Sequence, residues 1–212
     1  MRKLIITYVL SLCMSLAWAA DVRDLFVAMP DSVLPMLSSI NRLDMLDFHD
    51  SGMKAVVRNR LDGDSELTYL SRQSIRIRYT GSSEVDIRLF HYRDSVPLIC
   101  VVHTVESGGL RDSRIRFYDS GWNRLDGSRI LQTPSFESFI RSDLSRDSVA
   151  YIRRMSDINS VRVRVPDDSD RVEFEFTGLL YSSEDSLKCV SCLRKEPLIY
   201  DWNGRRFTQR RK

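Results

Sequence analysis

Three histidines, His49, His91 and His103, are the side chains of this 212-residue sequence best suited to proton transfer near neutral pH. A serine hydrolase would combine one of them with a serine on a sharp turn, but the Gly-x-Ser-x-Gly pattern of such a turn is missing from the sequence. His91 and His103 fall within runs typical of strands, so we interpret them as structural residues. His49 ends a predicted helix, where the helix dipole alone favours a positive imidazole. A hydrolase with an unrecognised arrangement of His and Asp stays open as the alternative.

Cysteine chemistry is the second candidate. Cys189 and Cys192 form a C-x-x-C pair, which in a redox enzyme stands at the start of a helix that lowers the thiol pKa. Pro197 follows too closely for a long helix, and a zinc site would need further Cys or His ligands nearby. We therefore predict a local disulfide or two structural thiols, with redox catalysis as the alternative. Cys100 lies in an apolar run and is predicted to be a core residue.

Two further motifs resemble ligand sites but lack essential parts. Asp167, Asp168 and Asp170 offer carboxylates for calcium, yet the glycine and the final glutamate of an EF-hand loop are missing. An ordinary hairpin loop is predicted instead. Gly108-Gly109 follows a predicted strand, but no Lys-Ser/Thr stands after it to contact phosphate. The sequence therefore predicts no catalytic, cofactor-binding or metal-binding residue.

The first residues indicate where the protein works. A short basic stretch precedes an apolar run over 4–16, and Ala17-Trp18-Ala19 matches the small-x-small pattern of a signal-peptidase site. We therefore expect residues 1–19 to be a signal peptide, too short to span a membrane, and residues 20–212 to be periplasmic or secreted. Cys13 could carry a lipid instead, but the residue before it is not small, which favours cleavage and release.

The charge of the chain argues against two classes of partner. Without the leader, 30 basic residues would remain beside 29 acidic ones, from 32 and 29 in the whole chain. A nearly neutral surface gives no electrostatic reason to expect nucleic acid or an anionic membrane. No segment after the leader is expected to span a membrane. Basic residues do gather at the end of the chain, where a solvated tail is predicted; they are Arg205, Arg206, Arg210, Arg211 and Lys212.

Short helices and hairpins are predicted in alternating groups. Capping residues followed by apolar residues at helical spacing predict helices; these begin after Asp21, after Asn41, after Thr133 and near Asp147. Turn sequences predict hairpins; these turn at 62–63, at 80–83, at 119–121, at 166–170 and at 203–204. The apolar run Pro97–Val105 is typical of a central strand that is covered on both faces. In the last hairpin, Tyr200, Trp202 and Phe207 are explained by cross-strand packing at least as well as by a binding platform.

Two of the hairpins carry alternating charges that determine their register. Each charged residue meets an opposite charge in only one alignment, because a shift by one residue would move every side chain to the other face. The predicted pairs are Arg76 with Asp86, Arg78 with Glu84, Arg162 with Glu175 and Arg164 with Glu173.

These elements predict an α+β fold, in which consecutive hairpins form antiparallel sheets and helices pack on one face. The other, exposed face would carry the paired arginine and acidic residues. We expect one domain over 20–212, with subdomains 20–130 and 131–212 as the alternative. The similarity between the two charged hairpins also leaves open a duplicated helix-plus-sheet unit.

Four segments of the sequence carry a resemblance to a known family. They are 24–32, 97–105, 112–119 with Trp122, and 198–207. Over essentially the whole mature chain they resemble a Bacteroidales-restricted family of secreted proteins of unknown function, domain of unknown function 3256. The resemblance implies a Gram-negative envelope setting and supplies no catalytic residue. We therefore expect a non-enzymatic module that binds an unknown protein or glycan partner of the envelope through a sheet face or edge. An envelope-associated hydrolase is the alternative.

Overall fold

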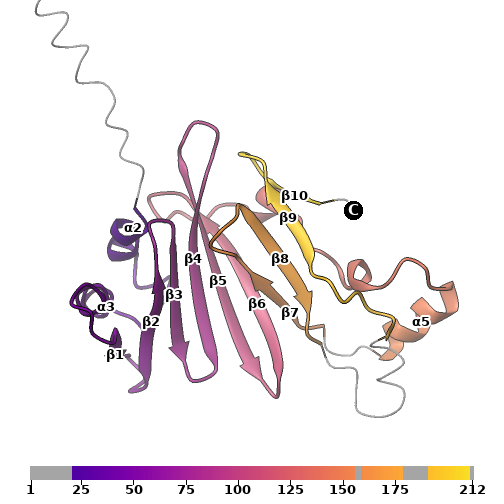
Figure 1. Cartoon of the computed structure of the whole chain (residues 1–212), viewed down its shortest axis with the longest axis horizontal. Coiled ribbons are helices and arrows are strands. Elements are labelled where there is room, and N and C mark those ends of the chain that lie inside the picture. Colours follow the sequence, from indigo (N-terminus) through magenta and orange to yellow (C-terminus); the bar gives the residue numbers. More distant parts are fainter. Residues whose placement is uncertain (1–20, 156–158, 179–190, 211–212) are drawn as a thin grey trace, which may run out of the picture.

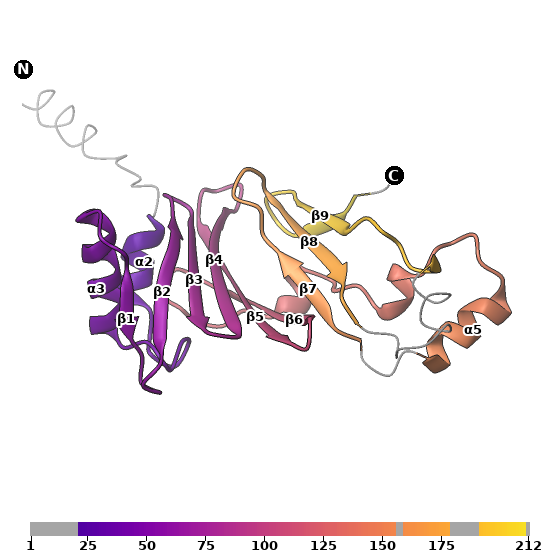
Figure 2. The same ribbon diagram turned by 60° about the horizontal axis from the view of Figure 1, so that its bottom comes forward.

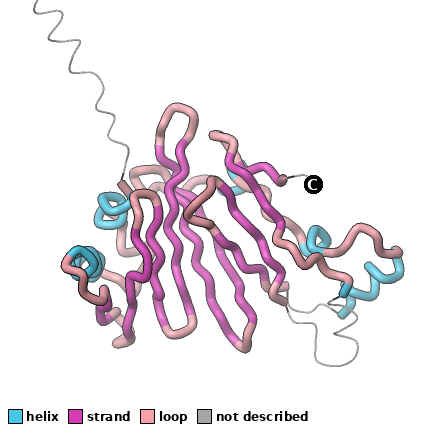
Figure 3. The backbone as a smooth tube through the Cα atoms, viewed as in Figure 1, coloured by secondary structure: helices cyan, strands magenta, loops and turns pink. Residues whose placement is uncertain are grey.

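The computed structural model describes residues 21–155, 159–178 and 191–210, in which helices flank two antiparallel sheets (Figure 1). The helical elements are α2 (Val22–Ala28), α3 (Ser39–Asp50), α4 (Gly127–Ile130), the 3-10 helix η1 (Phe136–Phe139) and α5 (Arg146–Met155). The strands are β1 (Val56–Arg58), β2 (Asp64–Leu70), β3 (Ser74–Thr80), β4 (Ser83–His91), β5 (Pro97–Ser107), β6 (Leu110–Tyr118), β7 (Val161–Arg164), β8 (Arg171–Phe176), β9 (Leu198–Trp202) and β10 (Phe207–Gln209). Helices α2 and α3 lie at one end of the molecule and α5 lies at the other, with the strands between them (Figures 1 and 3). The predicted signal peptide, residues 1–19, lies outside the described residues.

Both sheets are built from consecutive hairpins, as predicted. The first sheet has the order β1-β2-β3-β4-β5-β6 and the second has the order β10-β9-β8-β7. Strand β7 lies beside β6 (Figure 2), and its Val161 and Val163 N–H groups donate to side chains of β6. The acceptors are the Asp112 carboxylate at 3.1 Å and the Ser113 hydroxyl at 2.9 Å. Because these bonds go to side chains, the two backbone ladders stay separate. The predicted α+β class is confirmed.

The predicted registers of the charged hairpins are also confirmed. Strands β3 and β4 place Arg76 opposite Asp86, and Arg78 opposite Glu84. Strands β7 and β8 place Arg162 opposite Glu175, and Arg164 opposite Glu173. Opposite charges on facing strands attract, and the alternation of side chains leaves only one register in which every pair matches.

Strand β5 contributes its two faces to two different cores. Ile99 and Val101 pack into a core that contains α2 and α3. Leu98, Cys100 and Val102 point to the opposite face and pack into a core formed with the second sheet. Successive side chains of a strand point to opposite faces, so a continuous apolar run fits a strand that is covered on both sides. The sequence prediction for this strand is confirmed.

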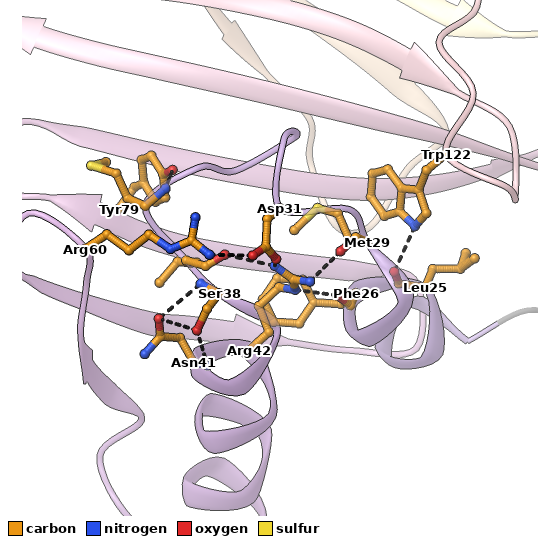
Figure 4. A network of polar contacts seen from close by, with 12 residues as sticks. Leu25, Phe26, Met29, Asp31, Ser38, Asn41, Arg42, Arg60, Tyr79 and Trp122 are labelled. Carbon is orange, nitrogen blue, oxygen red and sulfur yellow. Dashed lines mark hydrogen bonds and ion pairs between the residues drawn. The ribbon is translucent and has the colours of Figure 1, made fainter.

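A buried arginine of α3 holds the N-terminal segment in place (Figure 4). The Arg42 side chain is 1% exposed, and its Nε donates to the Phe26 carbonyl at 2.9 Å. Its Nη1 donates to the Leu37 carbonyl at 2.9 Å and to Asp31 Oδ1 at 3.0 Å, and its Nη2 donates to the Met29 carbonyl. The loop between α2 and α3 therefore wraps around one guanidinium, which satisfies carbonyls that the helices cannot satisfy.

Two predicted helix caps are wrong. Ser38, not Asn41, caps α3, because the Ser38 hydroxyl accepts the Asn41 N–H at 3.2 Å and the Asn41 side chain accepts the Ser38 N–H at 3.0 Å. Ser135, not Thr133, precedes η1, whose N–H groups bond three residues back, as in the 3.0 Å bond from Ser138 to Ser135. This spacing is that of a 3-10 helix. Asp21 caps α2 as predicted.

The hairpin predicted to turn at 119–121 is reduced to a single bridge between Tyr118 and Arg124. Strand β6 pairs with β5 instead, through a turn at Gly108-Gly109, where both residues have positive φ. Glycine adopts this conformation at little steric cost. The Trp122 indole N–H donates to the Leu25 carbonyl at 2.9 Å, which fastens α2 to the end of β6 (Figure 4).

The last hairpin turns at Asn203-Gly204 as predicted, and this turn packs against the β4–β5 turn. Gly204 has a φ of 84°, and a Cβ at this position would lie 2.7 Å from Cγ of Arg93. We expect Gly204→Ala to lower the free energy of unfolding by about 1–3 kcal/mol, because both the backbone conformation and the contact oppose a methyl group. Urea unfolding would measure the loss. Gly81→Ala, with no atom within 4 Å of its Cβ, is the control and should change stability by less than about 1 kcal/mol. Equal effects of the two substitutions would contradict the prediction.

Candidate functional site

The charged face of the first sheet is partly covered, which corrects the prediction that it is exposed. Asp86 and Arg88 of β4 are only 9% and 4% exposed. The loop 166–170 between β7 and β8 lies over them, with Asp167 at 3.5 Å from Arg76 and Asp170 at 3.7 Å from Arg88. The second sheet packs onto one face of β5, and this packing brings the loop over the neighbouring strands β3 and β4.

Asp86 lies at the centre of the covered charges. Arg76 Nε donates to Asp86 Oδ1 at 2.7 Å, and Arg162 of β7 lies 3.8 Å from Glu84. Burial raises the pKa of Asp86 to about 6, Arg76 opposes this rise, and the carboxylates of Glu84 and Asp167 add to it. A small cavity of about 220 Å³ lies among these groups. The charges therefore form a network that joins the two sheets.

A second cavity of about 400 Å³ lies beside this network. It is lined by the β2–β3 turn, the end of β4 and the β7–β8 loop, and we call it the arginine crevice. Its lining residues are Tyr69, Ser71, Arg72, Gln73, Arg88, His91 and Asp167.

Arg88 is the most buried charged residue of the arginine crevice, with 5% of its side chain exposed. Its Nη1 donates to the Ser74 hydroxyl at 2.8 Å, and its Nη2 lies 3.7 Å from Asp170. Its Nε is buried and has no hydrogen-bond partner among the residues that the structure describes. A buried donor without an acceptor is costly, so the Nε–H group of Arg88 is a polar group that its described neighbours leave unsatisfied.

Positive charge dominates the arginine crevice. Arg72 is exposed and has no acidic partner in the described part of the chain, and Gln73 and Tyr69 add neutral donors. The single lining carboxylate, Asp167, already lies 3.5 Å from Arg76. Guanidinium groups bind carboxylates through parallel N–H···O bonds, so this arrangement suits an anionic group.

The arginine crevice also gathers Ser71, His91 and Asp167, but no hydrogen bond between them occurs in the described structure. The Ser71 hydroxyl accepts the N–H groups of Gln73 at 3.3 Å and Ser74 at 3.0 Å. Asp167 is directed to arginine, and the buried Nε2 of His91 has no partner among the described residues. A proton relay requires these groups within hydrogen-bond reach of one another. Ser71, His91 and Asp167 therefore form no proton relay in the described structure.

The other two histidines lie elsewhere. His49 is exposed at the end of α3, with its Nδ1 3.5 Å from Asp50. His103 of β5 packs edge-on against Tyr79 at 5.4 Å, and burial lowers its pKa, with the nearby Arg116 charge adding to the effect. Its Nε2 is buried without a hydrogen-bond partner in the described residues.

The cysteine predictions are tested only at Cys100, which is fully buried in the second core as expected. Burial raises the pKa of its thiol. Cys192 is half-buried, with its sulfur 4.0 Å from the Ser191 hydroxyl. Cys189 lies outside the described residues, so the disulfide between Cys189 and Cys192 stays a prediction.

The terminal aromatic residues pack as a cross-strand cluster, as predicted. The rings of Trp202 and Phe207 lie 4.9 Å apart on facing strands, and both Tyr200 and Phe207 are buried. Arg205, Arg206 and Arg210 of the predicted solvated tail are exposed, and Arg210 also binds Asp201 at 2.6 Å. Arg211 and Lys212 lie outside the described residues.

Within the described residues, no group of three or more His, Cys, Asp or Glu side chains is placed to hold a metal ion. None of the described helices is long and apolar enough to cross a membrane. The carboxylates of Asp167 and Asp170 resemble calcium ligands in the sequence. In the structure they lie beside Arg76 and Arg88 instead.

Comparison with known proteins agrees with this architecture. A family model described as "Protein of unknown function (DUF3256)" matches residues 14–207. A solved structure, described as a domain of an uncharacterized protein from Porphyromonas gingivalis W83, superposes with a TM-score of 0.78 at 28% sequence identity. The superposition covers 90% of this chain and 98% of that chain. No curated protein matches the sequence.

Proposed function

This chain belongs to the DUF3256 family of proteins of unknown function, and we propose that it is a non-enzymatic binding module for a carboxylate-bearing ligand of the cell envelope. In this proposal the arginine crevice holds a carboxylate of the ligand. The module works outside the cytoplasm, an assignment that rests on the signal-like sequence of residues 1–19.

The observation that carries this proposal is the unused donor capacity of the crevice. Arg88 is 5% exposed and keeps an Nε without a partner, and Arg72 has no acidic partner among the described residues. The neighbouring arginine, Arg76, already pairs with the carboxylates of Asp86 and Asp167. The same chemistry would hold a carboxylate of a ligand between Arg72 and Arg88.

The proposal predicts that Arg72→Gln weakens carboxylate binding at least about tenfold, since a charge-assisted hydrogen bond contributes roughly 1.5–3 kcal/mol. The purified protein would be titrated with alginate oligomers, poly-L-glutamate and neutral dextran by calorimetry. Binding of either carboxylated polymer, but not of dextran, is expected, and the polymer that binds distinguishes a glycan ligand from a protein ligand.

Arg58→Gln is the matched control, because Arg58 is exposed, pairs with Asp62 and lies outside the crevice. It should bind as the wild type does. The proposal fails if neither carboxylated polymer binds, or if Arg72→Gln binds both as tightly as the wild type.

A hydrolase is the second candidate, because Ser71, His91 and Asp167 line the same crevice. A bound substrate would have to bring them into contact. Release of new reducing ends or amines from envelope polymers, abolished by His91→Gln, would establish this activity. Binding without turnover would support the binding module.

A further inference from the structure

A separate groove of about 720 Å³ lies between β10 and the segment that joins α4 to η1. It is larger than the arginine crevice and shares no lining residue with it. One wall is formed by Arg206, Thr208 and Gln209, and the opposite wall includes Gln132 and Thr133. We refer to it as the edge groove.

Strand β10 presents an unpaired backbone at this groove. It is the last strand of the second sheet, and within the described residues it pairs with β9 alone. The Arg206 carbonyl accepts the Asn203 N–H at 3.2 Å, and the Arg210 N–H donates to the Ile199 carbonyl at 2.8 Å, so the even-numbered residues bond toward β9. In an antiparallel ladder, residues at alternate positions then direct their N–H and C=O groups away from the partner strand. These are Phe207 and Gln209, which are available to a further strand.

The opposite wall has unpaired backbone as well. Leu131 has extended dihedral angles after α4, and the backbone groups of Gln132 and Thr133 form no hydrogen bond with another described residue. An extended chain in the edge groove would therefore lie between two segments with open hydrogen-bonding groups.

The charge and the side chains of the edge groove indicate which extended chain fits. Arg129 and Arg206 line it, and no acidic residue does. Arg206 has no acidic partner within the described ranges, whereas Arg129 pairs with Asp126, which does not line the groove. Both aromatic lining residues, Tyr200 and Phe207, are buried, so neither offers an exposed ring on which a sugar could stack.

We propose that the edge groove binds an extended, acidic segment of a partner protein, which adds to the second sheet as a strand beside β10. Backbone bonds to Phe207 and Gln209 would hold the segment, and Arg206 would select acidic side chains. Strand addition at an exposed sheet edge is a general mode of peptide recognition. This site is independent of the arginine crevice and of the function proposed for it.

The test uses synthetic heptapeptides, because the natural partner is unidentified. One probe alternates glutamate and valine, and the second alternates lysine and valine. We expect the acidic peptide to bind with a dissociation constant below about 1 mM, and the basic peptide to bind at least about tenfold more weakly. Fluorescence polarisation with labelled peptides would measure both.

Two variants at one position separate backbone pairing from side-chain contact. Gln209→Pro removes the outward N–H group and should weaken binding of the acidic peptide at least about tenfold, whereas Gln209→Ala keeps that group and should change it by less than about threefold. If Gln209→Pro fails to fold, an acidic peptide with N-methylated backbone should show the same loss with the wild-type protein.

Three results would overturn the proposal. They are the absence of acidic-peptide binding, equal binding of the acidic and basic peptides, and binding that N-methylation does not weaken. Binding of dextran or alginate that Arg206→Gln abolishes would assign the groove to a glycan instead. Loss of acidic-peptide binding in Gln209→Pro but not in Arg72→Gln assigns the peptide to the edge groove, and the reverse pattern assigns it to the arginine crevice, so failure of the crevice proposal and failure of this one are distinguishable.

Discussion

Replacement of Arg42 by leucine is expected to lower the free energy of unfolding by about 3–5 kcal/mol, because it removes a buried charge that several backbone groups depend on. The side chain is 1% exposed and donates to the carbonyls of Phe26, Met29 and Leu37. Leucine fills part of the space but donates no hydrogen bond. Each carbonyl left buried without a partner loses its interaction with water as well as its bond to the protein.

Urea unfolding followed by circular dichroism would measure this loss. Arg60→Gln is the matched control, because Arg60 pairs with the same Asp31 carboxylate but is 52% exposed. An exposed ion pair contributes about 0–1 kcal/mol, so the control should unfold almost as the wild type does. Arg42→Lys keeps the charge but lacks the planar fork, and we expect it to recover only part of the loss. An Arg42→Leu variant that loses less than about 1 kcal/mol would contradict the role assigned to this residue.

Asp86 is expected to make the stability of the protein fall as the pH rises from about 4 to 6. Its pKa is raised to about 6 from an ordinary value of 3.8, chiefly by burial. Between these two values the folded state holds a proton that the unfolded state has lost, so raising the pH favours unfolding. The shift of roughly two units corresponds to about 3 kcal/mol. This stabilisation is fully present below pH 3.8 and is lost once the pH exceeds 6.

The difference in stability between the wild type and Asp86→Asn isolates this effect, because the other titrating groups cancel. Between pH 4 and pH 7 the wild type should lose up to about 3 kcal/mol relative to the variant. Asp50→Asn provides a control of opposite sign at lower pH, since Arg23 holds the pKa of the exposed Asp50 below its ordinary value of 3.8 and this stabilisation is lost as the pH falls below about 4. A wild-type stability that stays parallel to that of Asp86→Asn from pH 4 to pH 7 would show that Asp86 titrates normally.

The strand registers could be predicted from the sequence because the information is local. Arg76 and Asp86 are ten residues apart, and only one alignment of the two strands pairs every charge. Helix caps were harder to predict, because Ser38 and Asn41 both carry side chains that cap helices and the structure uses them reciprocally.

The arginine crevice could not be predicted in the same way, because Arg76 and Asp167 lie 91 residues apart. A partial signal was nevertheless present in the sequence. Strand β5 was predicted to be covered on both faces, and Arg88 pairs across the ladder with Cys100 of that strand. Because Cys100 is covered by the second sheet, the side chain of Arg88 beside it has to lie close to that sheet as well. Combining the predicted coverage of β5 with this β4–β5 register places Arg88 at the edge of the second core.

The two faces of β5 also bear on how this protein could have been assembled in evolution. Residues on one face complete the core beneath α2 and α3, and residues on the other face complete the core beneath the second sheet. A gene fragment that encodes only the second sheet would lack Leu98, Cys100 and Val102, which form the floor of its core. The C-terminal half is therefore poorly suited to being inherited as a separate module. A change in β5 has to be compatible with both cores at once.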